Sequence, residues 1–90
     1  MNIQEITKLY EKITEQTTDP KVFSNLDLWR EAIDDASFMK SFLLRYKSIE
    51  ILESKKNNTK YEQDLIELKD ELKRLELSNK FIRIKNKYNS

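Results

Sequence analysis

Apolar residues recur at helical spacing along nearly the whole of this 90-residue chain, and strand-like alternation is almost absent. Steps of three and four residues place apolar side chains on one side of a helix. Short polar or proline-containing segments interrupt the pattern. The sequence therefore predicts an all-α fold, a small antiparallel helical bundle that forms a single domain over residues 1–90.

The composition excludes several classes of function. The chain has no histidine, cysteine or glycine. It therefore lacks the usual proton shuttle, a thiolate nucleophile, thiolate metal ligands and a glycine-rich phosphate loop. Charge is abundant but balanced, with 17 basic and 16 acidic side chains. We expect a protein that is not an enzyme, with no catalytic residues, cofactor or metal.

A long helical hairpin is expected over about residues 36–54 and 60–76. Asp34 and Asp35 precede its first helix, where carboxylates offset the positive end of a helix. Residues 55–58 form the expected loop, and Thr59 with Glu62 matches a capping box. A heptad seam then predicts packing at a shallow angle on the preceding helix. Its members are Tyr61, Leu65, Leu68, Leu72 and Leu75. The hairpin core is expected at Phe42, Ile49, Leu52, Leu65, Leu68 and Leu72.

Short helices are expected before the hairpin. A first helix is interrupted at residues 17–20, after which Asp19 fits an N-cap and Pro20 a first helical position. The second helix starts there or, alternatively, at Ser24 or Asn25. Its register predicts a buried side on which Trp29 anchors the core between helices; an interface hot spot is the alternative for Trp29. This side comprises Val22, Leu26, Trp29 and Ile33.

A short basic helix is expected at the C-terminal end, with Ser78 as its cap. Residues 1–54 carry a net charge of −3 and residues 55–90 a net charge of +4. Basic residues interleaved with aromatics can contact phosphates and bases, but cations are also favourable near a helix C-terminus, which is the simpler interpretation. The candidate nucleic-acid contacts are Lys80, Arg83, Lys85 and Lys87.

Asp27, Glu31 and Asp34 share one face of a helix, so we considered a site for a hard cation. The same pattern arises on any solvated helix face, and no further ligand set accompanies it. We therefore interpret these carboxylates as a solvated face.

The apolar stripes exceed what a 90-residue monomer can easily bury, which favours a homodimer, a small homo-oligomer or a complex with another protein. The first helix is terminal and can pack on its own hairpin or on a neighbouring chain. We therefore expect its stripe and two residues of the last helix to supply the interface. These residues are Ile3, Ile6, Tyr10, Ile13, Phe81 and Tyr88.

The arrangement of residues 26–90 resembles the YlbF/YmcA/YheA family of small helical bacterial proteins. The segments that carry the resemblance are residues 29–35, 39–46, 65–73 and 79–86. The resemblance implies a self-associating bundle and a regulatory role as an accessory factor in RNA processing by ribonuclease Y. Some family members hold an iron–sulfur cluster through C-terminal cysteines, which this chain lacks, so that cofactor is not carried over.

Three functional hypotheses follow from the sequence. The leading one is a cytoplasmic adaptor or regulator that acts through helix–helix contacts, since no membrane span or secretory signal is visible. A small inhibitor or immunity-type protein that caps a target enzyme is an alternative, because such a protein needs only a complementary surface. A weak nucleic-acid binder using the basic C-terminal helix is the other.

Overall fold

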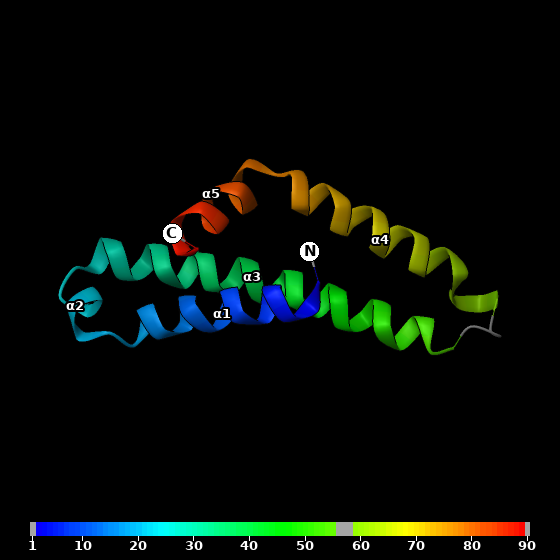
Figure 1. The fold of residues 1–90 in the computed structure, drawn as a ribbon, viewed down its shortest axis with the longest axis horizontal. Helices are drawn as coiled ribbons and strands as arrows, with labels where there is room; N and C mark the ends of the chain where they lie inside the picture. The colour runs from blue at the N-terminus through cyan, green and yellow to red at the C-terminus, as the bar shows by residue number, and fades with distance from the viewer. Residues whose placement is uncertain (1, 56–58, 90) are drawn as a thin grey trace.

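The computed structural model describes residues 2–55 and 59–89, and all regular structure in this part of the chain is helical (Figure 1). This confirms the all-α fold. The elements, in chain order, are α1 (Ile3–Thr17), α2 (Pro20–Phe23), α3 (Leu26–Glu53), the 3-10 turn η1 (Thr59–Tyr61), α4 (Glu62–Leu77) and α5 (Asn79–Tyr88).

α3 is one continuous helix of 28 residues, which corrects the expectation that a new helix starts after Asp34 and Asp35. The helix begins at Leu26 because the Asn25 side chain caps it, accepting hydrogen bonds from the backbone N–H groups of Asp27 and Leu28. The start at Asn25 was the alternative that the sequence left open. Asp35 lies in the middle of α3 and pairs with α5 instead of capping a helix.

The corner between α1 and α3 is built around α2 and Trp29. Asp19 caps α2 by accepting from the Lys21 N–H at 2.9 Å, and Pro20 takes the first position, as the sequence predicts. α2 lasts only four residues. Trp29 donates its indole N–H to the Thr17 carbonyl at 3.1 Å and packs near Phe23. Trp29 therefore links the end of α1 to the start of α3. It is only partly buried, so the expectation that it anchors the core is wrong.

α1 runs alongside α3 and makes the most extensive packing contact of the chain (Figure 1). α4 packs on the C-terminal half of α3, where Glu71 pairs with Arg45 and Lys69 pairs with Glu53. The expected hairpin of α3 and α4 is therefore present, but the pair of α1 and α3 dominates the fold. Of the residues expected in that hairpin core, Phe42, Ile49 and Leu72 are buried.

Phe42 occupies the centre of the hydrophobic core. Its ring stacks on Phe81 of α5, with centroids 4.8 Å apart, and on Tyr46, one turn along α3, at 5.6 Å. Residues from all four main helices surround it, so the core joins α1, α3, α4 and α5. The buried members are Ile6, Leu9, Ile13, Met39, Phe42, Leu43, Ile49, Leu72, Phe81 and Ile84.

The start of α4 differs from the prediction, whereas the start of α5 matches it. η1 precedes α4, and Tyr61 in the cap position makes no side-chain cap hydrogen bond, so the expected capping box does not start this helix. Most of the expected loop at residues 55–58 lies outside the described residues. Ser78 separates α4 from α5 and accepts a hydrogen bond from the Phe81 N–H at 3.2 Å. α5 then folds back over the N-terminal half of α3 (Figure 1).

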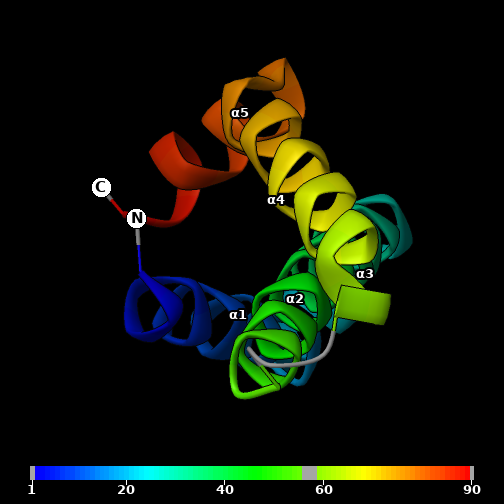
Figure 2. The ribbon, with the colours of Figure 1, turned by 90° about the vertical axis from the view of Figure 1, so that its right-hand side faces the viewer.

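The molecule is elongated. Its extents are 52 × 22 × 20 Å and its radius of gyration is 15.3 Å, whereas a compact domain of this length has a radius of about 12 Å. Seen along the long axis, α1 and α4 lie on two different sides of α3 (Figure 2). α3 is therefore the central helix, on which both α1 and α4 pack.

We expect Phe42→Ala to destabilise the protein by about 3–5 kcal/mol, because it opens a cavity where four helices meet. Chemical denaturation followed by circular dichroism measures this loss. Leu28→Ala is the matched control on the same helix, since Leu28 is exposed, and should change stability by less than about 1 kcal/mol. Equal losses in the two variants would contradict the assignment of Phe42 to the core.

Candidate functional site

Charged side chains form a network between α3 and α5. Glu31, Asp34 and Asp35 share one side of α3, at steps of three and one, and they face three cations of α5. Lys80 pairs with Asp34 at 2.8 Å, and Lys87 pairs with Glu31 at 2.8 Å. The two helices are antiparallel, because the later cation on α5 meets the earlier acid on α3.

Asp35 is the buried centre of this network and is fully inaccessible to solvent. One carboxylate oxygen accepts from the Arg83 guanidinium at 3.0 Å, and the other accepts from the Tyr88 hydroxyl at 3.0 Å. A buried carboxylate is tolerated only when it is paired and hydrogen-bonded. Asp35 therefore ties α5, through Arg83 and Tyr88, to the N-terminal half of α3.

The network shifts the pKa values of its members. The hydrogen bond and charge of Lys87 hold the pKa of the Glu31 carboxyl below its ordinary value of 4.5. Lys80 lowers the pKa of Asp34 in the same way. Burial and the hydrogen bond to Asp35 raise the pKa of the Tyr88 hydroxyl. Each shift favours the protonation state that the ion pairs need at neutral pH.

Three of the four candidate nucleic-acid contacts belong to this network. Lys80, Arg83 and Lys87 pair with carboxylates of α3, and only Lys85 has no ion pair within the described part of the chain. The nucleic-acid hypothesis stays a prediction, but the pairs leave little of the local positive charge for phosphates.

The residues expected at a partner interface lie mostly in the core of the chain itself, which corrects their assignment. Ile6, Ile13 and Phe81 are buried. Ile3, Tyr10 and Tyr88 are partly buried and pack against the same core. The sequence allowed α1 to pack on its own chain or on a neighbouring chain. In the structure, α1 packs on the apolar face of its own α3.

The acidic residues do not assemble a metal site. Glu31 and Asp34 bind lysines of α5, and Asp27 lies in the exposed first turn of α3. Over residues 2–55 and 59–89, no group of acidic side chains is arranged to hold a metal ion.

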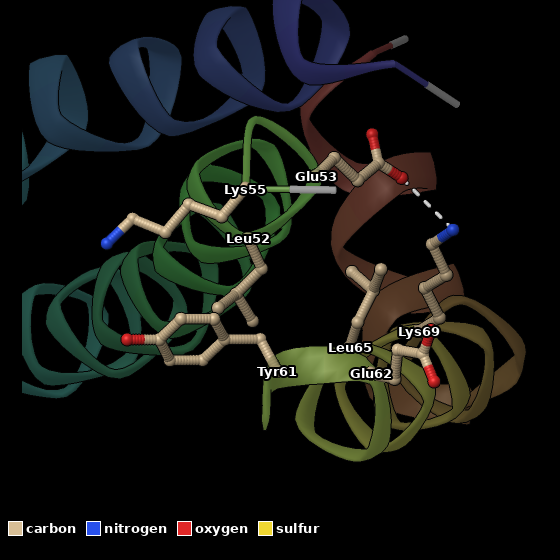
Figure 3. A pocket seen from close by; sticks show the side chains of 7 residues that line it. All are labelled: Leu52, Glu53, Lys55, Tyr61, Glu62, Leu65 and Lys69. Atoms are coloured by element: carbon tan, nitrogen blue, oxygen red, sulfur yellow. Dashed lines mark ion pairs between the residues drawn. The ribbon is translucent and has the colours of Figure 1, made fainter. Parts of the chain in front are cut away.

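A cleft of about 420 Å³ lies between α3 and α4 at the far end of the hairpin (Figure 3). Leu52, Tyr61 and Leu65 supply its apolar lining, and the ion pair of Glu53 with Lys69 crosses one side. The Lys55 ammonium lies 5.3 Å from the centre of the Tyr61 ring. The lining offers apolar contact but no nucleophile activated by a base.

Four aliphatic side chains of α3 face away from the core, and we call them the outer stripe. They are Leu26, Ile33, Leu44 and Ile51, exposed at 60%, 39%, 54% and 59% respectively. Their spacing of 7, 11 and 7 residues keeps them within about 20° of one another around the helix. α3 is therefore apolar on two opposite sides.

The outer stripe corrects the expectation that Leu26 and Ile33 are buried. We expected them on the inner side because they share a register with Trp29. The spacing of Ile33, Leu44 and Ile51, with 18 residues from the first to the last, was the available signal, because 18 residues make five full turns.

Comparisons with known proteins add no assignment: a scan against protein-family models found no matching family, and searches of curated proteins and of solved structures found no match. None of the described helices is both long enough and apolar enough to cross a membrane. The outer stripe is thus the candidate functional surface that the geometry itself provides.

Asp35→Ala should destabilise the protein by about 1–3 kcal/mol, because Arg83 and Tyr88 lose their partner and α5 loses its anchor. Chemical denaturation measures the change. Asp34→Ala is the control: its carboxylate is exposed and its pair with Lys80 is worth less than about 1 kcal/mol. A smaller effect for Asp35→Ala than for Asp34→Ala would show that the buried pair does not hold α5.

The lowered pKa values of Glu31 and Asp34 predict a loss of stability in acid. A carboxylate whose pKa is lowered by folding stabilises the native state above its unfolded pKa, and this contribution disappears as the pH falls through the folded pKa. We therefore expect the melting temperature to fall as the pH drops below about 4.5. The double variant Glu31→Gln with Asp34→Asn should show a shallower decline in the same titration, and an unchanged slope would contradict this origin.

Proposed function

We propose that this chain is a non-catalytic, cytoplasmic regulatory or adaptor protein that acts by docking its outer stripe against a helix of another protein chain. The observation that carries the proposal is the exposure of four aliphatic side chains in one register of α3. Apolar side chains that recur in one register along a helix form a seam against which a second helix can pack.

The chemistry of the outer face supports a helical occupant. The stripe is straight, because α3 is one uninterrupted helix of 28 residues, or about 42 Å. Its residues recur every 7 or 11 positions, which is the spacing at which a second helix can lie along the first. Arg30 flanks the stripe on the side next to α4, and Lys40 and Lys47 flank it on the other side. Acidic groups of the occupant on the Arg30 side would therefore be complementary.

The composition supports a role without catalysis. The chain contains no histidine or cysteine, and its hydroxyl groups serve mainly local backbone bonds at helix ends, as Ser54 and Ser78 do. The resemblance of residues 26–90 to the YlbF/YmcA/YheA family supports, as part of the same proposal, an accessory role in ribonuclease-dependent RNA processing.

Affinity purification with three forms of the protein tests this proposal. We expect the wild type to retain a protein partner, and the double variant Ile33→Asp with Leu44→Asp to lose it, because two charges enter the stripe. Leu77→Asp is the control, since Leu77 on α4 is 79% exposed and lies outside the stripe. Circular dichroism verifies that all three forms are equally helical.

The pattern of retention decides the outcome. A partner kept by the wild type and by Leu77→Asp but lost by the double variant supports docking through the stripe, and a ribonuclease among such partners supports the RNA-processing role. Partners retained equally by all three forms would contradict the proposed surface.

A further inference from the structure

The outer stripe reads the same from either end of α3, since its intervals are 7, 11 and 7 residues. We infer that its occupant is a second copy of this chain, with the two α3 helices packed antiparallel across a twofold axis. In such an interface residue i contacts residue j and residue j contacts residue i. This inference rests on the proposed function, because it uses the same surface and names what covers it.

The antiparallel register matches every aliphatic residue of the stripe with another. With the axis midway between Ile33 and Leu44, Leu26 of one copy meets Ile51 of the other, and Ile33 meets Leu44. All four contacts are therefore apolar. A parallel pairing would also match each residue of the stripe with itself, but it would hold Arg30 of each copy about 25 Å along the helix from position 47 of the other, and so far from the acidic residues of α4.

Charge complementarity favours the antiparallel arrangement. Arg30 lies 18 residues, or five turns, before Ser48 and so shares its position around the helix. Arg30 and Ser48 therefore lie on the flank of the stripe next to α4. Leu52, one turn after Ser48, marks this flank, because it lines the same groove as three acidic residues of α4, namely Asp64, Glu67 and Glu71. We call these three residues the acidic edge. The antiparallel register places Arg30 of one copy level with Lys47 of the other. Lys47 lies about 100° around the helix from Arg30, on the opposite flank, and the twofold axis brings equal flanks together, so Arg30 faces this acidic edge.

Two carboxylates of the acidic edge are not used in ion pairs within the described residues. Glu71 is shared with Arg45 of its own chain, whereas Asp64 and Glu67 have no ion pair within the described residues. Arg30 likewise has none in that part of the chain. Two such contacts, related by the axis, would pair groups that the single chain leaves in solvent.

The exposed area is consistent with one side of a dimer interface. The chain exposes 6470 Å², whereas a compact monomer of 10.9 kDa exposes about 5,600 Å². The surplus of roughly 900 Å² is close to the ~800 Å² that each partner contributes to a standard interface. A face about 38 Å long, from Leu26 to Ile51, is large enough to supply it.

Disulfide cross-linking tests the register directly, because the natural chain contains no cysteine. A mixture of Leu26→Cys and Ile51→Cys proteins should form a mixed covalent dimer on oxidation, and so should Ile33→Cys with Leu44→Cys. Leu26→Cys alone should not cross-link, because its two copies lie about 37 Å apart in this register, far beyond disulfide reach. Leu77→Cys is the control outside the stripe.

The cross-linking patterns are unambiguous. Crossed products without self-products support the antiparallel dimer. Self-linked Leu26→Cys overturns it in favour of a parallel pair, and cross-linking of Leu77→Cys at the same rate overturns it as random collision.

Sedimentation equilibrium tests the association and separates this inference from the proposed function. The wild type should have twice the 10.9 kDa monomer mass, and Ile33→Asp with Leu44→Asp should weaken the dimer by about 100-fold or more, since each change occurs twice. A monomeric wild type at all concentrations overturns the dimer, yet the proposed function survives if a different protein is retained through the stripe. A stripe-dependent dimer that retains no other protein supports the inference and contradicts the adaptor role.

Discussion

The structure depends on the length of α3 relative to the helices that can cover it. α3 has 28 residues, while α1, α4 and α5 have 15, 16 and 10. None of the three can bury the apolar side of α3 alone, so α1 and α5 cover its first part and α4 covers its end. Phe42 lies where these contacts meet, with Phe81 stacked against it. The shared core makes four helices one packing unit, and it also makes the molecule long and thin.

The uneven charge of the chain is used within the molecule. The net −3 of residues 1–54 and the net +4 of residues 55–90 meet where α5 lies on α3. Asp35 sets the register of that contact, because it is buried and its partners Arg83, Lys87 and Tyr88 all belong to α5. The desolvation of a buried charge offsets much of the free energy that its ion pair gains. Here its clear effect is to select one position of α5 along α3.

The inner and outer sides of α3 have different roles. The inner side is aromatic and continuous, and the chain itself covers it. The outer side carries isolated aliphatic residues separated by Ser37, Lys40 and Ser48, which is too sparse for a core and too apolar for an ordinary solvated face. An amphipathic helix needs only one apolar side to fold. The second side is therefore where we place the function of this protein.

Local sequence signals determined the helical class, the capped starts of α2 and α5 at Asp19 and Ser78, and the buried positions of Phe42 and Leu72, because periodicity and caps act within a few residues. Tertiary structure alone decided that α3 continues through Asp35, that α1 packs inward, and that Lys80, Arg83 and Lys87 are neutralised. These outcomes depend on contacts between residues about 30 to 80 positions apart. The sequence also could not tell which apolar side of α3 is covered, since the residues of both sides recur at the helical period. Only the tertiary structure decided this, because α1, α4 and α5 all pack on the inner side and leave the outer stripe exposed.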